Sequence, residues 1–202
     1  MQPAPEIDQV AAGIGIWQGY DAAVKAELFS TALETKRGLC LVDPIPLDPV
    51  ALDRFSLTPT SVFVTNINHA RACIDFGKYF SVPIFAHVDL IGRDDFPRIS
   101  GVQDAEMFTP QLTAIALPGG PAGEMALHCD RDGGAIVMGD ALINFEPHGF
   151  ALLPAKYCTD AKLLRRSLQK LLKHSFDRML FAHGAPILSG ARSRLEQLLT
   201  KN

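Results

Sequence analysis

Apolar residues in this chain fall in short runs, and turn-forming residues close most of these runs. Residues 39–42 form one such run, which ends at Asp43 and Pro44, and residues 114–117 form another, which a glycine- and proline-rich loop follows. Runs of this length are typical of buried β-strands, whereas a membrane-spanning helix needs about 18 consecutive apolar residues. The pattern predicts a chain built on short strands, with no span across a membrane.

Helical spacing of apolar residues appears in a few longer stretches, of which 160–174 is the clearest. There, five leucines fall on one half of a helix and five lysines and arginines on the other. Strands come first and are then mixed with helices, twice over, which predicts two layers of sheet with helices outside them. We expect strands at 23–34, 39–42, 62–64, 84–86, 114–117, 124–128, 135–138 and 179–181, and helices at 69–80, 160–174 and 191–199.

The length of 202 residues suits one domain, so we expect a single domain over 1–202 with residues 1–12 as a loosely ordered lead-in. The net charge is −3, but residues 161–202 carry +7 and the residues before them −10. The basic side chains of 160–174 lie on the solvated half of their helix, and no aromatic residues stand between them for base stacking. We therefore expect no nucleic-acid partner.

The cysteines are scattered and include no C-x-x-C pair; they are Cys40, Cys73, Cys129 and Cys158. Glu6 and Asp8 precede the first basic residue, Lys25, so the N-terminal stretch does not have the pattern of a secretory signal. Both features indicate reduced thiols, and we expect a cytoplasmic protein.

Four segments, taken in order, carry a resemblance to a known family. They are Leu41-Val42-Asp43-Pro44, Val62-Phe63-Val64-Thr65 before a polar loop and a helix, Val137-Met138-Gly139-Asp140, and Phe181-Ala182-His183-Gly184 after the basic helix. Together these segments resemble the metallo-β-lactamase superfamily over nearly the whole chain. The resemblance implies fold class α/β (α+β), a four-layer αβ/βα sandwich with its site at one edge of the sheets.

The family's metal-binding loop, T-H-x-H-x-D-H, is altered in this chain. The matching stretch is Thr65-Asn66-Ile67-Asn68-His69-Ala70-Arg71, and a further family histidine falls at Gly119-Gly120. A neutral amide is a poor zinc ligand, and an arginine repels a cation. Asp140 and His183 alone match ligand positions, so the resemblance implies that the usual two-metal site is lost and that no metal cofactor is expected.

An alternative is a rebuilt site for one zinc, iron or manganese ion. His69 stands one position from a ligand slot, and with Asp140, His183 and Glu124 it would supply nitrogen and oxygen ligands. In the metal-free case we expect Arg71 to pair with Asp140, directly or through one water, and the other possibility is that it points into solvent. The residues expected to line the cleft are Asn66, Asn68, His69, Arg71, Glu124, Asp140 and His183.

Three functions follow from the resemblance and its departures. The first is a metal-free protein of this fold that binds a small polar or anionic molecule in the cleft. The second is a hydrolase of an ester, thioester or lactone with a reduced, mononuclear metal site. The third is a non-catalytic interaction module. The altered ligand positions favour the first, and we expect a small-molecule ligand; the fold alone does not decide the reaction.

Overall fold

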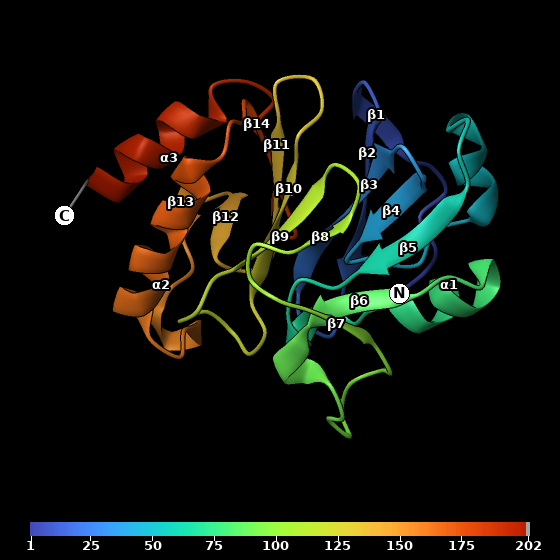
Figure 1. Ribbon diagram of the computed structural model, residues 1–202, viewed down its shortest axis with the longest axis horizontal. Coiled ribbons are helices and arrows are strands. Elements are labelled where there is room, and N and C mark those ends of the chain that lie inside the picture. The colour runs from blue at the N-terminus through green and yellow to red at the C-terminus, as the bar shows by residue number, and fades with distance from the viewer. Residues whose placement is uncertain (201–202) are drawn as a thin grey trace.

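The computed structural model describes residues 1–200, the side chain of Arg54 excepted, and consists of two β-sheets packed face to face with helices outside them (Figure 1). Among these residues, no helix combines the length and apolar character that crossing a membrane requires. Short 3₁₀ turns connect several of the larger elements. They are Pro49–Arg54, Ile67–His69, Val88–Leu90, Ala155–Tyr157 and Leu168–Lys173.

The first half of the chain forms a seven-stranded sheet whose spatial order follows the sequence. Its strands are β1 (Asp8–Ala11), β2 (Ile14–Asp21), β3 (Ala26–Thr35), β4 (Gly38–Val42), β5 (Pro59–Phe63), β6 (Ile84–His87) and β7 (Ser100–Val102). Strands β1 to β4 pair antiparallel through short turns, and β4 to β7 pair parallel. Helix α1 (Cys73–Phe80) connects β5 to β6 and packs against the outer face of this sheet.

The second half forms a five-stranded sheet in the order β14-β11-β10-β9-β8, in which β11 and β14 are the parallel pair. Its strands are β8 (Met107–Thr109), β9 (Leu112–Ala116), β10 (Met125–Cys129), β11 (Ala135–Met138) and β14 (Arg178–Phe181). A separate hairpin of β12 (Leu142–Phe145) and β13 (Gly149–Leu152) follows β11. Helices α2 (Ala161–Ser167) and α3 (Ala191–Thr200) cover the outer face.

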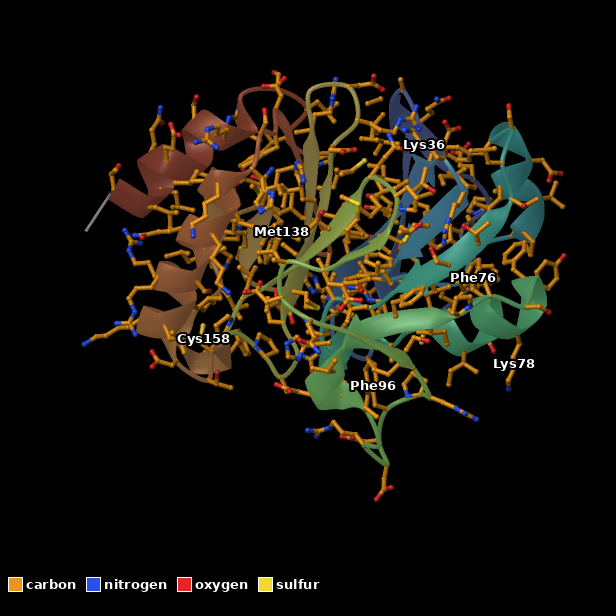
Figure 2. All side chains as sticks on the ribbon, viewed as in Figure 1. Lys36, Phe76, Lys78, Phe96, Met138 and Cys158 are labelled. Carbon is orange, nitrogen blue, oxygen red and sulfur yellow. The ribbon has the colours of Figure 1, made fainter. Side chains whose placement is uncertain are left out.

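Side chains alternate between layers along each strand, because successive residues of a strand point to opposite faces. In β10, Met125 and Leu127 pack between the two sheets, whereas Ala126 packs under the helices. Met138 lies in the same outer layer as Ala126. Phe76, a residue of α1, packs in the apolar layer between that helix and the first sheet (Figure 2). The core therefore has three apolar layers, which makes the molecule a four-layer αβ/βα sandwich.

The N-terminal residues differ from the expectation of a loose lead-in. Residues Asp8–Ala11 form β1, and Ile7 is 1% exposed in the outer core layer of the first sheet. Strand β2 was not expected either, because Gly15 and Gly19 interrupt its apolar pattern. A Cβ atom on Gly15 would lie 2.5 Å from the ring of Phe55, so this glycine allows a close approach within the strand.

Two expected helices are shorter than the sequence pattern indicated. The helix expected at 69–80 begins at Cys73, because residues Ile67–His69 form a separate 3₁₀ turn and Arg71 takes a left-handed backbone angle. The basic helix begins after Asp160, whose carboxylate accepts a hydrogen bond from the Leu163 amide, and it continues as a 3₁₀ turn after residue 167.

Candidate functional site

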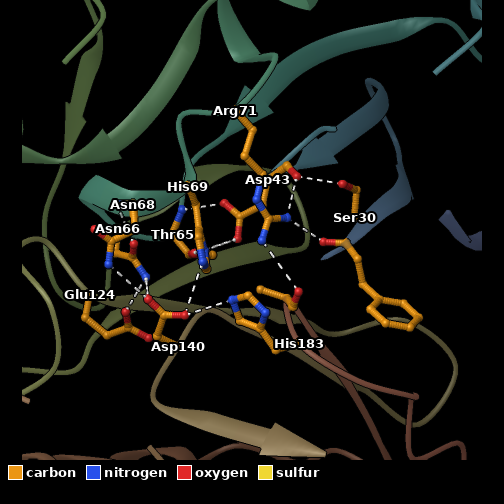
Figure 3. A network of polar contacts seen from close by, with 12 residues as sticks. Ser30, Asp43, Thr65, Asn66, Asn68, His69, Arg71, Glu124, Asp140 and His183 are labelled. Atoms are coloured by element: carbon orange, nitrogen blue, oxygen red, sulfur yellow. Dashed lines mark hydrogen bonds and ion pairs between the residues drawn. The ribbon is translucent and has the colours of Figure 1, made fainter. Parts of the chain in front are cut away.

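The candidate site lies where the parallel strands of both sheets end. Asp43 follows β4, and Thr65 follows β5 in the first sheet; Asp140 follows β11, and His183 follows β14 in the second. Parallel strands bring the loops after their carboxyl ends to one edge, and this is where ligands bind in open α/β sheets. The topology therefore brings together polar residues that are far apart in the sequence (Figure 3).

Two histidines and one aspartate form a compact group at this edge. The Nε2 atoms of His69 and His183 lie 3.2 Å and 3.1 Å from Oδ1 of Asp140. One ligand atom from each of the three residues lies within 4.8 Å of the others. His69 and Asp140 are buried, whereas the His183 side chain is 21% exposed, so the group is accessible from one side.

Asp43 and Thr65 both contact Nδ1 of the His69 imidazole, the ring nitrogen that faces away from Asp140. The Thr65 hydroxyl donates to Oδ2 of Asp43 at 2.6 Å, and Nδ1 of His69 lies 2.9 Å from the same oxygen. Because the Asp43 carboxylate only accepts, Nδ1 carries a ring proton and Nε2 is directed at Asp140. A favourable contact between Nε2 and the Asp140 carboxylate then requires a second ring proton or a cation.

The charges around His69 act in opposite directions on its pKa. Burial lowers the pKa, and so does the nearby Arg71 guanidinium, but the Asp43 and Asp140 carboxylates outweigh both and raise it to about 9. Burial also works against ionisation of Asp140, yet the positive charge of His69 and the hydrogen bonds from His183 and His69 hold the pKa of Asp140 far below its ordinary value. In the absence of a metal, both shifts favour a protonated His69 paired with an ionised Asp140.

Two asparagines and a glutamate complete the surroundings of Asp140. Nδ2 of Asn66 lies 2.6 Å from Oε2 of Glu124 and 3.1 Å from Oδ2 of Asp140, and Nδ2 of Asn68 lies 3.3 Å from the same Asp140 oxygen. Glu124 also accepts the Ala141 amide at 2.9 Å. Burial, with a further contribution from Asp140, raises the pKa of Glu124 to about 8. Asn66 and Glu124 thus support Asp140 from the protein interior.

The expected direct pairing of Arg71 with Asp140 is wrong, and so is the alternative that Arg71 points into solvent. Its Nη1 atom donates to the carbonyls of Phe29 at 2.6 Å and Asp43 at 3.1 Å, and Nη2 lies 3.5 Å from the carbonyl of Ala182. The fork of the guanidinium finds its acceptors on the backbone because Asp140 already accepts from two histidines and two asparagines.

A cleft of about 940 Å³ opens above the group. Its floor includes Asn68, His69, Arg71, Asp140 and His183. Its walls are mainly apolar and come from the β2–β3 turn, the β12–β13 hairpin and the 3₁₀ turn before α2. The wall residues include Val24, Leu28, Ile143, Phe145, Leu153, Pro154 and Tyr157. A small molecule with an apolar part fits such a site.

The structure places five of the seven expected site residues on the cleft and two behind it. Asn66 is fully buried and Glu124 is 4% exposed, and neither lines the cleft: Asn66 contacts Asp140 directly, and Glu124 contacts Asn66. Asp43 and Thr65 were missed as functional residues. The signal was present, since both were recognised as strand-end residues of resembling segments, but the contact with His69 depends on the tertiary fold.

Comparisons with known proteins agree with this architecture. No sequence model of a known protein family and no curated protein sequence matches the chain. Among solved structures, a metallo-β-lactamase from Pontibacter korlensis superposes with a TM-score of 0.76 at 14% identity, over 98% of this chain and 99% of its own. One from Erythrobacter litoralis gives 0.76 at 12% identity, over 97% and 96%.

A third structure, of a metallo-β-lactamase family protein from Thermus thermophilus, gives a TM-score of 0.69 at 16% identity, over 95% of this chain and 79% of its own. The chain therefore has the metallo-β-lactamase fold, and the fold class predicted from the sequence is confirmed. Within that fold, the loop after β5 carries Asn66 and Asn68 beside His69.

Proposed function

We propose that this protein is a metal-dependent hydrolase with a mononuclear site formed by His69, Asp140 and His183. The observation that carries the proposal is the convergence of three ligand atoms within 4.8 Å at the floor of a cleft. The sequence alone favoured a metal-free cleft, because it could not show that His69 turns inward. The position of His69 supports the mononuclear alternative better.

The residues present do not fit a two-metal site of the resembling family. Asn66 and Asn68 donate their amide groups to carboxylates, and Arg71 brings a positive charge to the edge of the site. A second cation would meet the donors of Asn66 and Asn68 instead of lone pairs. These three positions therefore argue against a second ion and support a site with a single ligand set.

That remaining set fits a single divalent cation. Two ligand atoms about 2.0–2.1 Å from zinc at a tetrahedral angle are about 3.3 Å apart. Two of the three separations are close to this value, since Asp140 Oδ1 lies 3.2 Å from Nε2 of His69 and 3.1 Å from Nε2 of His183, and all three ligand atoms lie within 4.8 Å of one another. Asp43 binds the remote nitrogen of His69, the arrangement that orients histidine ligands in metalloproteins. The set of two histidines and one carboxylate suits zinc or iron(II).

The chain's own residues would perform distinct tasks in hydrolysis. Asp43 and Thr65 fix the ring of His69, and Asn66 and Asn68 fix the carboxylate of Asp140. The apolar walls of the cleft would hold the non-reacting part of the substrate and exclude water from the floor. A divalent cation in such a site polarises a substrate carbonyl and makes water more acidic.

The substrate class follows from the same cleft. Its mainly apolar walls above a polar floor favour a substrate with an apolar acyl group next to the bond that is cleaved. We therefore propose an ester, thioester or lactone with a hydrophobic acyl part. The neighbours named metallo-β-lactamases support hydrolysis as the reaction class by analogy of fold only.

The test is metal analysis together with ester hydrolysis on protein purified without added metal and without a nickel column. We expect about one equivalent of zinc, iron or manganese in the wild type, and His183→Ala should weaken metal binding by about 10–100-fold or more. His148→Ala, which alters a cleft histidine outside the group, serves as the control and should keep the metal. A wild type that takes up none of these metals when they are added would overturn the proposal.

A second candidate function is binding of a small polar molecule without a metal. The observation that favours it is the complete set of donors around Asp140, two imidazoles and two amides, which satisfies the carboxylate with no cation present. The metal analysis separates the candidates, because only the hydrolase requires a bound ion. Ligand binding that is unchanged by a chelator would support this second candidate.

A further inference from the structure

We propose that Arg71 is a positioning residue of this site. Its guanidinium fixes the position of the His183 ring relative to the His69 ring, because it contacts backbone carbonyls of both sheets. The effect on metal binding rests on the proposed function, whereas the effect on the two imidazoles does not. Arg71 stands at the position of a histidine in the resembling family's loop, and its contacts differ from those expected of it.

The guanidinium contacts three separate segments. Nη1 donates to the Phe29 carbonyl in β3 at 2.6 Å and to the Asp43 carbonyl after β4 at 3.1 Å. Nη2 lies 3.5 Å from the carbonyl of Ala182, which follows β14 in the other sheet. The Phe29 amide donates to that same Ala182 carbonyl at 3.0 Å. Arg71 therefore reinforces the point at which the two sheets are joined (Figure 3).

Two of the three residues contacted, Asp43 and Ala182, are directly connected to a histidine of the group. Asp43 is the residue whose carboxylate holds Nδ1 of His69 at 2.9 Å, and Ala182 directly precedes His183. The imidazole rings of His69 and His183 have centroids 5.5 Å apart. A shift of the Ala182 carbonyl relative to Asp43 would change this separation, because the two rings are attached to different sheets. Arg71 is positioned to keep it fixed.

The geometry of the arginine itself indicates a specific role. Arg71 has a φ angle of 42°, in the left-handed region that non-glycine residues rarely adopt, and this backbone angle precedes α1. Burial lowers the pKa of Arg71, while the surrounding carboxylates of Asp43, Asp140 and Asp21 work in the opposite direction. A strained and partly buried arginine persists only where its contacts compensate for its desolvation and strain.

The chain also contains a matched control for a purely structural role. Arg131, in the turn between β10 and β11, donates to the Glu34 carbonyl at 3.0 Å, and Glu34 belongs to β3. Arg131 therefore also connects the second sheet to β3 through a backbone carbonyl, near the other end of that strand. Its substitution should loosen the sheets without moving the histidine rings.

The first readout is the affinity of the metal-free protein for Co²⁺, followed by the visible spectrum and by calorimetry. Arg71→Met should weaken the affinity by about 10–100-fold, the usual effect of losing a group that orients metal ligands. Arg71→Lys should remain at least about tenfold weaker, because one ammonium group cannot replace the planar fork across three carbonyls. Arg131→Met should leave the Co²⁺ affinity and spectrum unchanged. Equal effects of Arg71→Met and Arg131→Met would overturn the proposal.

The second readout does not depend on a metal. In the metal-free protein, nuclear Overhauser contacts between the rings of His69 and His183 should be present in the wild type and in Arg131→Met, and lost in Arg71→Lys. If the wild type binds no Co²⁺, the proposed function fails, and this readout still decides the role of Arg71. If Arg71→Met does not fold, Arg71→Lys decides in the same way. Unchanged ring contacts in a folded Arg71 variant would overturn the positioning role.

Discussion

Nδ1 of His69 lies 2.9 Å from Oδ2 of Asp43, although 26 residues separate them in the sequence. The carboxylate of Asp43 also accepts from the amide and the hydroxyl of Thr65, at 2.8 Å and 2.6 Å. Asp43 is 2% exposed, so all of these contacts are formed away from water. Asp43 thereby determines which nitrogen of His69 is directed at Asp140, and the orientation of the site begins with this one residue.

Removing the Asp43 carboxylate should strongly destabilise the fold. Asp43→Ala leaves the Thr65 amide without a partner and removes the carboxylate that pairs with His69, whose Nδ1 keeps only the Thr65 hydroxyl at 2.8 Å; breaking such a buried interaction costs about 3–5 kcal/mol. The free energy of unfolding in urea measures the loss. Asp95→Ala, which removes an exposed carboxylate paired with Arg93, should change it by less than about 0.5 kcal/mol. Similar losses in both variants would contradict the role given to Asp43.

The two asparagines of the loop should differ in their effect on stability. Asn66 is fully buried and donates to both Glu124 and Asp140, so Asn66→Ala should cost about 3 kcal/mol or more. Asn68 is exposed and contributes its side-chain amide to Asp140 alone, at 3.3 Å, so Asn68→Ala should cost about 1 kcal/mol or less. Urea denaturation of both variants tests this order, and a larger loss in Asn68→Ala would refute it.

The glycine after His183 allows a close backbone approach that an alanine would prevent. A Cβ atom on Gly184, whose φ is 105°, would overlap the backbone carbonyl of Asn144 in β12. Gly184→Ala should therefore cost about 3 kcal/mol or more, from overlap added to backbone strain. Gly149→Ala separates the two effects, because its φ is 61° and no atom lies within 4 Å, so only about 1–2 kcal/mol of strain applies. Equal losses in the thermal unfolding of both variants would show that the overlap is relieved.

The buried Glu124 should give the metal-free protein a specific pH dependence. Burial raises the pKa of Glu124 to about 8 from an ordinary value of 4.5, so between these pH values the folded state keeps a proton that the unfolded chain releases. The contribution of Glu124 to stability is thus present below pH 4.5 and is lost as the pH rises towards 8, by up to about 1.4 kcal/mol per pH unit.

The measurement is urea denaturation of the wild type and Glu124→Gln at several pH values from 5 to 8. The free energy of unfolding of the wild type, relative to the variant, should decrease across this range, because glutamine does not titrate. The other titrating groups are common to both proteins and affect them in the same direction. Parallel pH profiles would show that Glu124 is ionised throughout.

The sequence was sufficient for the elements that build the site and for the fold class. Strands β4, β5, β11 and β14 each contain a short apolar run, and a polar residue stands within two positions of the end of each strand, so both the strands and their ends could be located. Strand β2 could not, because Gly15 and Gly19 resemble turn residues in the sequence and only packing against Ile7 and Phe55 shows why glycine is needed at Gly15.

The contacts between the site residues were harder to predict than the residues themselves. Arg71 was expected to bind Asp140 because a carboxylate is the usual partner of a guanidinium, yet its acceptors are backbone carbonyls that no side-chain pattern reveals. The inward position of His69 depends on the 3₁₀ turn at Ile67–His69, in which Asn66 accepts the Asn68 amide at 2.8 Å. This local turn was missed because a polar loop had been expected at residues 65–68 and a helix only from residue 69 onwards.

The division of the molecule into two sheets has a consequence for its synthesis. Strands β1 to β7 end at residue 102, and they supply Asp43 and His69, whereas Asp140 and His183 come from the later half. During translation the first sheet can form while the face that carries Cys40 and Phe63 still lacks its cover. A nascent chain at this stage contains only half of the site. Any ligand that contacts both histidines therefore binds only the completed chain, and its binding energy opposes separation of the two halves.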